Sequence, residues 1–196
     1  MQTIAEFDAA TVRATVAVVD KIQAADLGRP TPCAGWDLRA LLAHMTAQHR
    51  GFAAAAAGRG DDLTVWRPPA LAGDFARVYA AAADEVIGAF AAGGVLDRPF
   101  ALPEISTERS VPGRIAVGFH LVDYVVHGWD VATAAGLAWD PPADAVAAAL
   151  PVARAVPVGA ARETPGAAFA AALPVPPGAT ALQEILALLG RTAATS

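Results

Sequence analysis

Residues 120–130, HLVDYVVHGWD, contain two of the chain's four histidines with a carboxylate between them. His120, Asp123 and His127 follow one another at i, i+3 and i+7, which places them on one face of an α-helix. Imidazole and carboxylate groups on a shared face could bind a metal ion, transfer protons or form a polar seam between packed helices. The spacing leaves these three interpretations open.

Asp123 and His127 are four residues apart, the spacing at which one helical face offers two ligands to a metal ion. Imidazole with carboxylate suits Zn²⁺, and Ni²⁺ or iron is also compatible with these ligand types. Two ligands do not make a tight site, so a third must come from another helix and water could fill the rest. An open position would make the site catalytic in type rather than structural.

Two histidines of the second predicted helix are candidates for the third ligand. His49 lies near the centre of that helix's apolar stripe, whereas His44 lies at the stripe's edge. Periodicity alone does not choose between them. Either could also be a histidine packed in or beside the core and hydrogen-bonded to a neighbour.

Three further residues near these motifs have a chemical and a structural interpretation. His120 is one turn from Asp123, which favours a role as hydrogen-bond partner or proton carrier over that of a fourth ligand. Asp130 lies three residues after His127 and could orient it or cap the backbone. Cys33 precedes a helix N-terminus, which would lower a thiol's pKa, but its small, apolar neighbours are more typical of a buried cysteine.

The elements that must position these residues are helices. Hydrophobic residues make up 55% of the 196-residue chain, and alanine, a strong helix former, supplies much of that share. Apolar periodicity and Gly/Pro punctuation predict helices over 8–25, 35–56, 72–92, 112–135, 141–152 and 180–191. The pattern predicts an all-α protein, with a four-helix bundle over residues 1–140 and a helical or irregular C-terminal extension over 141–196 packed on it.

Charge and cysteine content narrow the functional classes. The net charge is −5 and no run of Lys or Arg occurs, which argues against nucleic acid as a partner. A single cysteine excludes an intrachain disulfide and a CxxC zinc site. The N-terminus lacks the features of a secretion signal, and the alanine runs are too short to span a bilayer. These features predict a cytoplasmic protein with no membrane partner.

Two segments resemble the signature blocks of a known family. TPCAGWDLRALLAHM (31–45) and HLVDYVVHGWDVATAAG (120–136) are similar to blocks of the DinB-like bundle family that includes mycothiol-dependent maleylpyruvate isomerase, and most of all to its actinobacterial branch of uncharacterised metal-binding proteins. The resemblance covers nearly the whole chain, including the ALQEILALLGR tail. It implies a DinB-like four-helix bundle that holds a divalent metal, usually zinc, through His44, Asp123 and His127. The isomerase itself has glutamate where this chain has Asp123.

The resemblance and the ligand spacing together predict a metal-dependent, mycothiol-type thiol transferase or isomerase that acts on a small electrophile, with His120 moving a proton. Mycothiol would be the cosubstrate. The alternative is a non-catalytic metal-binding module or sensor. A third interpretation is a structural protein whose polar stripe is a helix–helix seam, which would pair His120 with another helix. The alanine-rich helices are compatible with a homodimer, although nothing in the sequence requires one.

Overall fold

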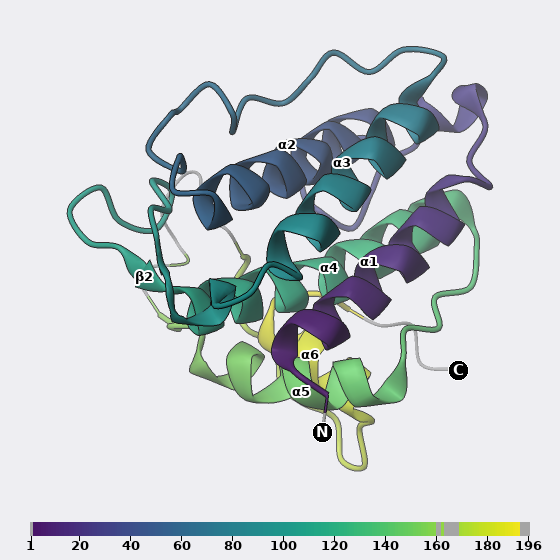
Figure 1. The fold of residues 1–196 in the computed structure, drawn as a ribbon. Coiled ribbons are helices and arrows are strands. Elements are labelled where there is room, and N and C mark those ends of the chain that lie inside the picture. Colours follow the sequence, from purple (N-terminus) through teal and green to yellow (C-terminus); the bar gives the residue numbers. More distant parts are fainter. Residues whose placement is uncertain (1, 160–161, 163–168, 193–196) are drawn as a thin grey trace.

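The computed structural model describes residues 2–159, 162 and 169–192, and most of them are helical. Figure 1 shows long helices lying side by side, with a shorter C-terminal pair beneath them. The α-helices are α1 (Ile4–Val19), α2 (Leu38–Ala56), α3 (Phe75–Phe90), α4 (Gly113–Ala135), α5 (Ala143–Ala155) and α6 (Ala181–Leu188). Two 3₁₀ turns, η1 (Ala24–Gly28) and η2 (Val95–Asp97), and two short strands, β1 (Pro99–Phe100) and β2 (Val111–Pro112), complete the elements. The predicted all-α class is confirmed.

The first four α-helices form a bundle because each packs against two of the others. α1 contacts α4 and α3, and α2 contacts α3 and α4, which closes the ring. Buried aliphatic and aromatic side chains fill the interior, among them Leu41, Leu42, Met45, Tyr79 and Tyr124. α2 and α4, which carry the candidate ligands, therefore face each other across the core.

Helix ends follow from local capping chemistry. Thr3 forms a capping box with Glu6, so α1 begins four residues before the predicted start at Asp8. The Asp37 side chain accepts a hydrogen bond from the Ala40 amide at 2.8 Å and fixes the start of α2. α4 ends at Gly136, whose φ of 68° is the left-handed conformation that glycine adopts readily.

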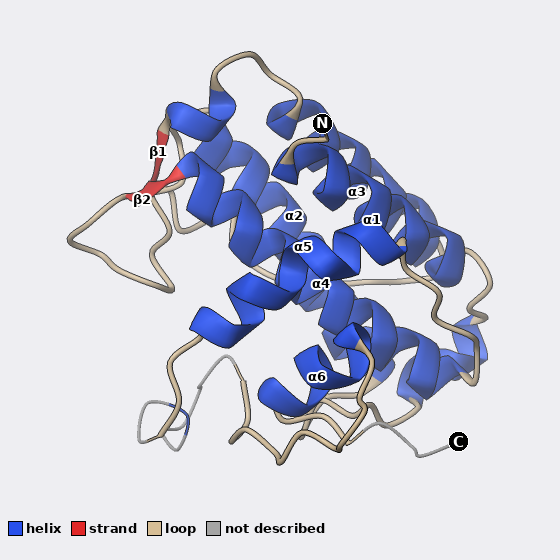
Figure 2. Ribbon diagram, turned by 90° about the horizontal axis from the view of Figure 1, so that it is seen from below, coloured by secondary structure: helices blue, strands red, loops and turns tan. Residues whose placement is uncertain are grey.

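The C-terminal helices cover the outer side of α4. α5 packs on α4 and α1, and α6 packs on α5. Figure 2 shows α6 on the opposite side of the molecule from α3, and β1 paired with β2 at one end of the bundle. The covering residues form one apolar cluster with α4 that includes Val125, Ala149, Ile185, Leu186 and Leu189.

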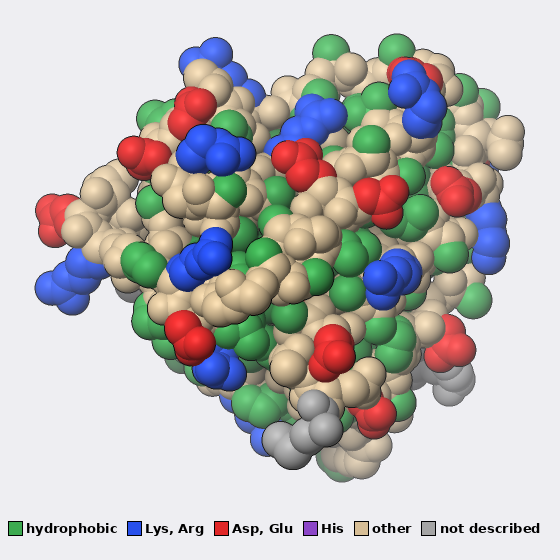
Figure 3. Space-filling view, in the orientation of Figure 1, with side chains coloured by type: hydrophobic (Ala, Val, Ile, Leu, Met, Phe, Trp, Pro, Cys, Tyr) green, Lys and Arg blue, Asp and Glu red, His purple; other side chains and the backbone are tan. Residues whose placement is uncertain are grey.

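The surface is mixed in charge. On the face drawn in Figure 3, Lys and Arg side chains alternate with Asp and Glu side chains rather than gathering by sign. Among the described residues, no helix combines the length and the apolar character that crossing a bilayer requires.

Candidate metal centre

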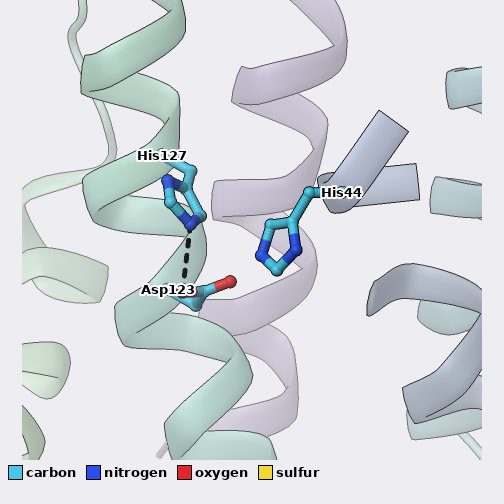
Figure 4. A group of neighbouring side chains, drawn as sticks. All are labelled: His44, Asp123 and His127. Carbon is cyan, nitrogen blue, oxygen red and sulfur yellow. Dashed lines mark ion pairs between the residues drawn. The ribbon is translucent and has the colours of Figure 1, made fainter. Parts of the chain in front are cut away.

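His44 of α2 meets Asp123 and His127 of α4 at the interface between the two helices. Each side chain offers a ligand atom, and these three atoms all lie within 4.8 Å of one another. The Asp123 Oδ1 atom is 3.4 Å from Nε2 of His127, as the i,i+4 spacing requires, and the ring of His44 points at both from the facing helix (Figure 4). We call these three residues the metal cluster.

The donor set fits a divalent cation such as Zn²⁺, which takes imidazole nitrogen and carboxylate oxygen. Burial, aided by His127 and opposed by Asp123, lowers the pKa of His44 to about 4. His44 is therefore neutral at pH 7 and has a lone pair to donate. Burial lowers the pKa of His127, but Asp123 and Asp130 outweigh that effect and the net pKa is raised.

His127 is held by a buried chain of polar contacts. Its Nδ1 atom lies 3.0 Å from Oδ2 of Asp130, and both side chains are buried. Donation from Nδ1–H to Asp130 leaves Nε2, the nitrogen nearest Asp123, unprotonated and available to a metal. The sequence raised Asp130 as a residue that could orient His127, and the structure brings the two together.

Arg191, which follows α6, completes this chain of contacts. It donates to both oxygens of Asp130, through Nε at 3.3 Å and through Nη2 at 3.0 Å. The Arg191 side chain is buried. Burial raises the pKa of Asp130, but the contacts with His127 and then with Arg191 outweigh that effect, and the net pKa is lowered. Sequence reasoning missed Arg191 because no spacing relates the end of the terminal helix to a motif 61 residues earlier.

Two residues of the loop before α2 also lie at the centre. The Trp36 ring centroid is 4.8 Å from that of His44 and 6.5 Å from that of His127, so the indole packs against both imidazoles of the metal cluster. Cys33 is half-buried, and its thiol lies near Arg191. Burial raises the pKa of this thiol despite the lowering effect of Arg191, opposite to the lowering expected at a helix N-terminus.

His120 and His49 belong to a second, separate polar group. The Nδ1 atom of His120 is 2.7 Å from Oδ1 of Asp8, and its Nε2 atom is 3.2 Å from Nδ1 of His49. All three side chains are fully buried, and the Tyr124 ring stacks on both imidazoles. We call Asp8, His49 and His120 the histidine seam. It pairs His120 with two other helices, as a helix–helix seam would.

Asp8 was not among the candidate residues, although the sequence contained a signal for it. Asp8 stands four residues before Val12, the first residue of that helix's apolar stripe. A carboxylate at a stripe position is a candidate for burial with a partner. Periodicity left open which histidine of α2 is the third candidate ligand. In the structure His44 belongs to the metal cluster, and His49 belongs to the histidine seam.

A surface hollow of about 660 Å³ lies between the start of α1, the end of α3 and η2. Thr3, Arg13, Phe90 and Arg114 are in its lining, and Phe90 also packs against His120 of the histidine seam. None of the metal-cluster residues lines this hollow.

Known proteins of similar sequence and fold were found in three comparisons. Residues 9–132 match the family described as mycothiol maleylpyruvate isomerase N-terminal domain. Two proteins of Mycobacterium tuberculosis, both described as uncharacterized, are 31% identical over 184 residues, which cover 91% of this chain and 92% of theirs: Rv0738 of strain ATCC 25618 / H37Rv and MT0763 of strain CDC 1551 / Oshkosh.

A crystal structure of the mycothiol-dependent maleylpyruvate isomerase shares the fold. The TM-score is 0.54, with 14% sequence identity over 83% of this chain and 72% of that one. This likeness confirms the DinB-like bundle predicted from the sequence, and the sequence match covers most of α1 to α4. The chain therefore belongs to the family of the mycothiol maleylpyruvate isomerase N-terminal domain.

Proposed function

We propose that this protein is a divalent-metal-dependent thiol transferase or isomerase that joins a mycothiol-type thiol to a small electrophile. The observation that carries the proposal is the convergence of His44, Asp123 and His127 from two facing helices. Membership of the mycothiol maleylpyruvate isomerase family supports a thiol as the cosubstrate.

Within this proposal the metal cluster holds Zn²⁺, and Ni²⁺ or iron is compatible with the same ligands. A cation bound there would supply Lewis acidity that lowers the pKa of a thiol. Other features of the chain keep the candidate ligands ready to bind the cation. Asp130 fixes the tautomer of His127, burial keeps His44 neutral, and Trp36 packs against both imidazoles.

Catalysis by His120 stays a prediction. Both of its ring nitrogens bond within the histidine seam, to Asp8 and to His49, and its side chain is fully buried. A direct proton transfer from His120 to a substrate would require these bonds to open.

A non-catalytic metal-binding module is the second candidate, and one observation favours it. Trp36 packs against the imidazoles of His44 and His127, and neither the hollow between α1, α3 and η2 nor a second one beside α6 is lined by a residue of the metal cluster. A site filled by its own side chains would hold a metal without admitting a substrate. A turnover assay distinguishes the enzyme from the non-catalytic metal-binding module.

The test combines metal analysis with a conjugation assay. Wild type and Asp123→Asn are purified with zinc, and Asp140→Asn, which changes an exposed aspartate beyond α4, is the matched control. We expect about one zinc per chain in the wild type and the control and a large loss in Asp123→Asn. Full zinc occupancy in Asp123→Asn would refute the ligand assignment.

The enzyme claim is tested on the same samples. Zinc-loaded wild type is incubated with mycothiol and a panel of small electrophiles, and loss of free thiol is followed. We expect turnover that disappears with Asp123→Asn and persists with Asp140→Asn. Stoichiometric zinc without turnover across the panel would favour the metal-binding module instead.

A further inference from the structure

A second carboxylate approaches the metal centre from a loop. Gln48 stands one turn after His44 on α2 and is 5% exposed. Its Nε2 atom donates to both carboxylate oxygens of Glu104, at 3.2 and 3.0 Å. Residues four apart on a helix share a face and lie about 6 Å apart. Glu104 is therefore fixed beside the face of α2 that carries His44.

The loop that carries Glu104 is anchored at both ends. Phe100 of β1 pairs with Val111 of β2, and Phe100 and Leu102 are buried in the bundle. The Leu102 carbonyl accepts hydrogen bonds from the amides of Ile105 and Ser106, at 2.9 and 3.0 Å, and closes a turn around Glu104. This turn aims the carboxylate at Gln48, while part of the Glu104 side chain stays in solvent.

The electrostatics of Glu104 suit a proton acceptor. Burial raises the pKa of its carboxyl, the hydrogen bond from Gln48 lowers it, and the negative charge of Asp123 raises it again, for a net increase. A carboxylate with a raised pKa is a better base near neutral pH than an ordinary glutamate.

The other carboxylates and histidines around the metal centre already have partners. Asp130 binds Arg191 and His127, and His120 lies in the histidine seam. His44, Asp123 and His127 form the metal cluster itself. Among the described residues around the cluster, Glu104 is thus a carboxylate that combines a fixed position with access to solvent.

We propose that Glu104 is the catalytic proton acceptor that deprotonates the incoming thiol at the metal centre. The inference rests on the proposed function. The S–H bond breaks, its proton passes to a carboxylate oxygen of Glu104, and the electron pair stays on sulfur, which then attacks the electrophile. Glu104 is left as a carboxylic acid that returns the proton to the product. Gln48 can donate to the carbonyl oxygen of that acid, so it positions Glu104 in both states.

The experiment follows turnover as a function of pH, and mycothiol binding is measured separately. Zinc-loaded wild type and Glu104→Gln are assayed with mycothiol and a small electrophile. Wild-type turnover should fall as the pH drops through the pKa of Glu104, because a protonated carboxyl group cannot accept the thiol proton. Glu104→Gln should bind mycothiol as the wild type does, lose that step of the pH profile, and turn over about 100-fold more slowly.

Glu108→Gln is the matched control, because Glu108 is an exposed glutamate of the same loop. It is expected to match the wild type in both measurements. Equal turnover and the same pH profile in wild type and Glu104→Gln overturn the role of Glu104 and leave the proposed function standing. The same changes in Glu108→Gln also overturn it, because loop charge would then be the cause. Failure of zinc-loaded wild type to bind mycothiol overturns both proposals.

Discussion

Two imidazoles of the metal cluster differ in how readily they take a proton, and their neighbours explain the difference. His44 has no carboxylate partner at hydrogen-bond distance among the described residues, and burial lowers its pKa to about 4. His127 contacts Asp123 and Asp130, and these charges raise its pKa. His44, one candidate ligand, is therefore kept neutral by burial, and His127, the other, is held in its orientation by a carboxylate.

The lowered pKa of His44 predicts a pH-dependent stability of the metal-free protein. The unfolded chain binds a proton at His44 below pH 6.5, whereas the folded chain resists it down to about pH 4. The stability that the protein gains by keeping His44 neutral is complete above pH 6.5 and is lost as the pH falls towards 4. The pKa difference between the unfolded and the folded chain corresponds to about 3 kcal/mol of unfolding free energy.

Urea unfolding of metal-free wild type and His44→Gln at pH 7.5 and pH 4.5 measures this effect. We expect the wild type to lose more stability on acidification than His44→Gln, because glutamine does not titrate. The histidine His49, whose pKa burial also lowers, is common to both proteins and cancels in the comparison. An equal loss in both would contradict a depressed pKa at His44.

For single residues, the sequence predicts the relative positions of those that share a helix. It does not predict contacts between residues that the tertiary fold brings together. Asp123, His127 and Asp130 were identified because helical spacing fixes their relative positions. The choice between His44 and His49 depended on the rotation of α2 about its axis, which periodicity does not determine. Arg191, Glu104 and Gln48 meet their partners through tertiary contacts, and no local pattern announces such a contact.

Among the elements, α4 is shaped by the segment that follows it. Trp139, beyond the end of α4, donates from Nε1 to the Val125 carbonyl at 3.1 Å and packs against Gly128. A Cβ at Gly128 would lie 2.4 Å from the indole, so the helix needs glycine there. Gly128 adjoins His127, and the fit of Trp139 thus supports the helical turn that carries this candidate metal ligand.

Gly128→Ala is expected to destabilise the protein although alanine favours helix. The clash with Trp139 should cost about 1–3 kcal/mol, more than the roughly 1 kcal/mol gained from helix propensity. Gly88→Ala in α3 is the matched control, since a Cβ there meets nothing within 4 Å. Thermal unfolding should show a lower Tm for Gly128→Ala and an unchanged or higher Tm for Gly88→Ala. Equal shifts would rule out the packing argument.

Elements were predicted well in kind and less well in extent. All six α-helices were expected, because apolar periodicity and Gly/Pro breaks mark them. The first was placed too late in the chain because the capping box of Thr3 and Glu6 lies outside its apolar stripe. Its predicted end at residue 25 ran past Val19, since 3₁₀ turn η1 continues the helix-like pattern after a break.

At the scale of the whole molecule, the C-terminal segment packs on the bundle and also contacts the candidate metal centre. α5 and α6 bury an apolar face of α4, and Arg191 extends from the end of α6 to Asp130. The sequence predicted that this extension packs on the bundle, but it left open whether the segment reaches the site. That answer depended on one buried ion pair between residues 61 positions apart.

Arg191→Lys tests whether the C-terminal segment tunes the metal centre. Arginine donates to both oxygens of Asp130, and lysine cannot reproduce that planar fork. Asp130 would then hold His127 less firmly, and zinc affinity should fall about 10- to 100-fold. Arg114→Lys is the control, because Arg114 pairs with Asp97 at 3.4 Å on the exposed surface. Competition with a zinc-binding dye measures both affinities. If Arg191→Lys and Arg114→Lys bind zinc equally well, the C-terminal segment covers the bundle without acting on the metal centre.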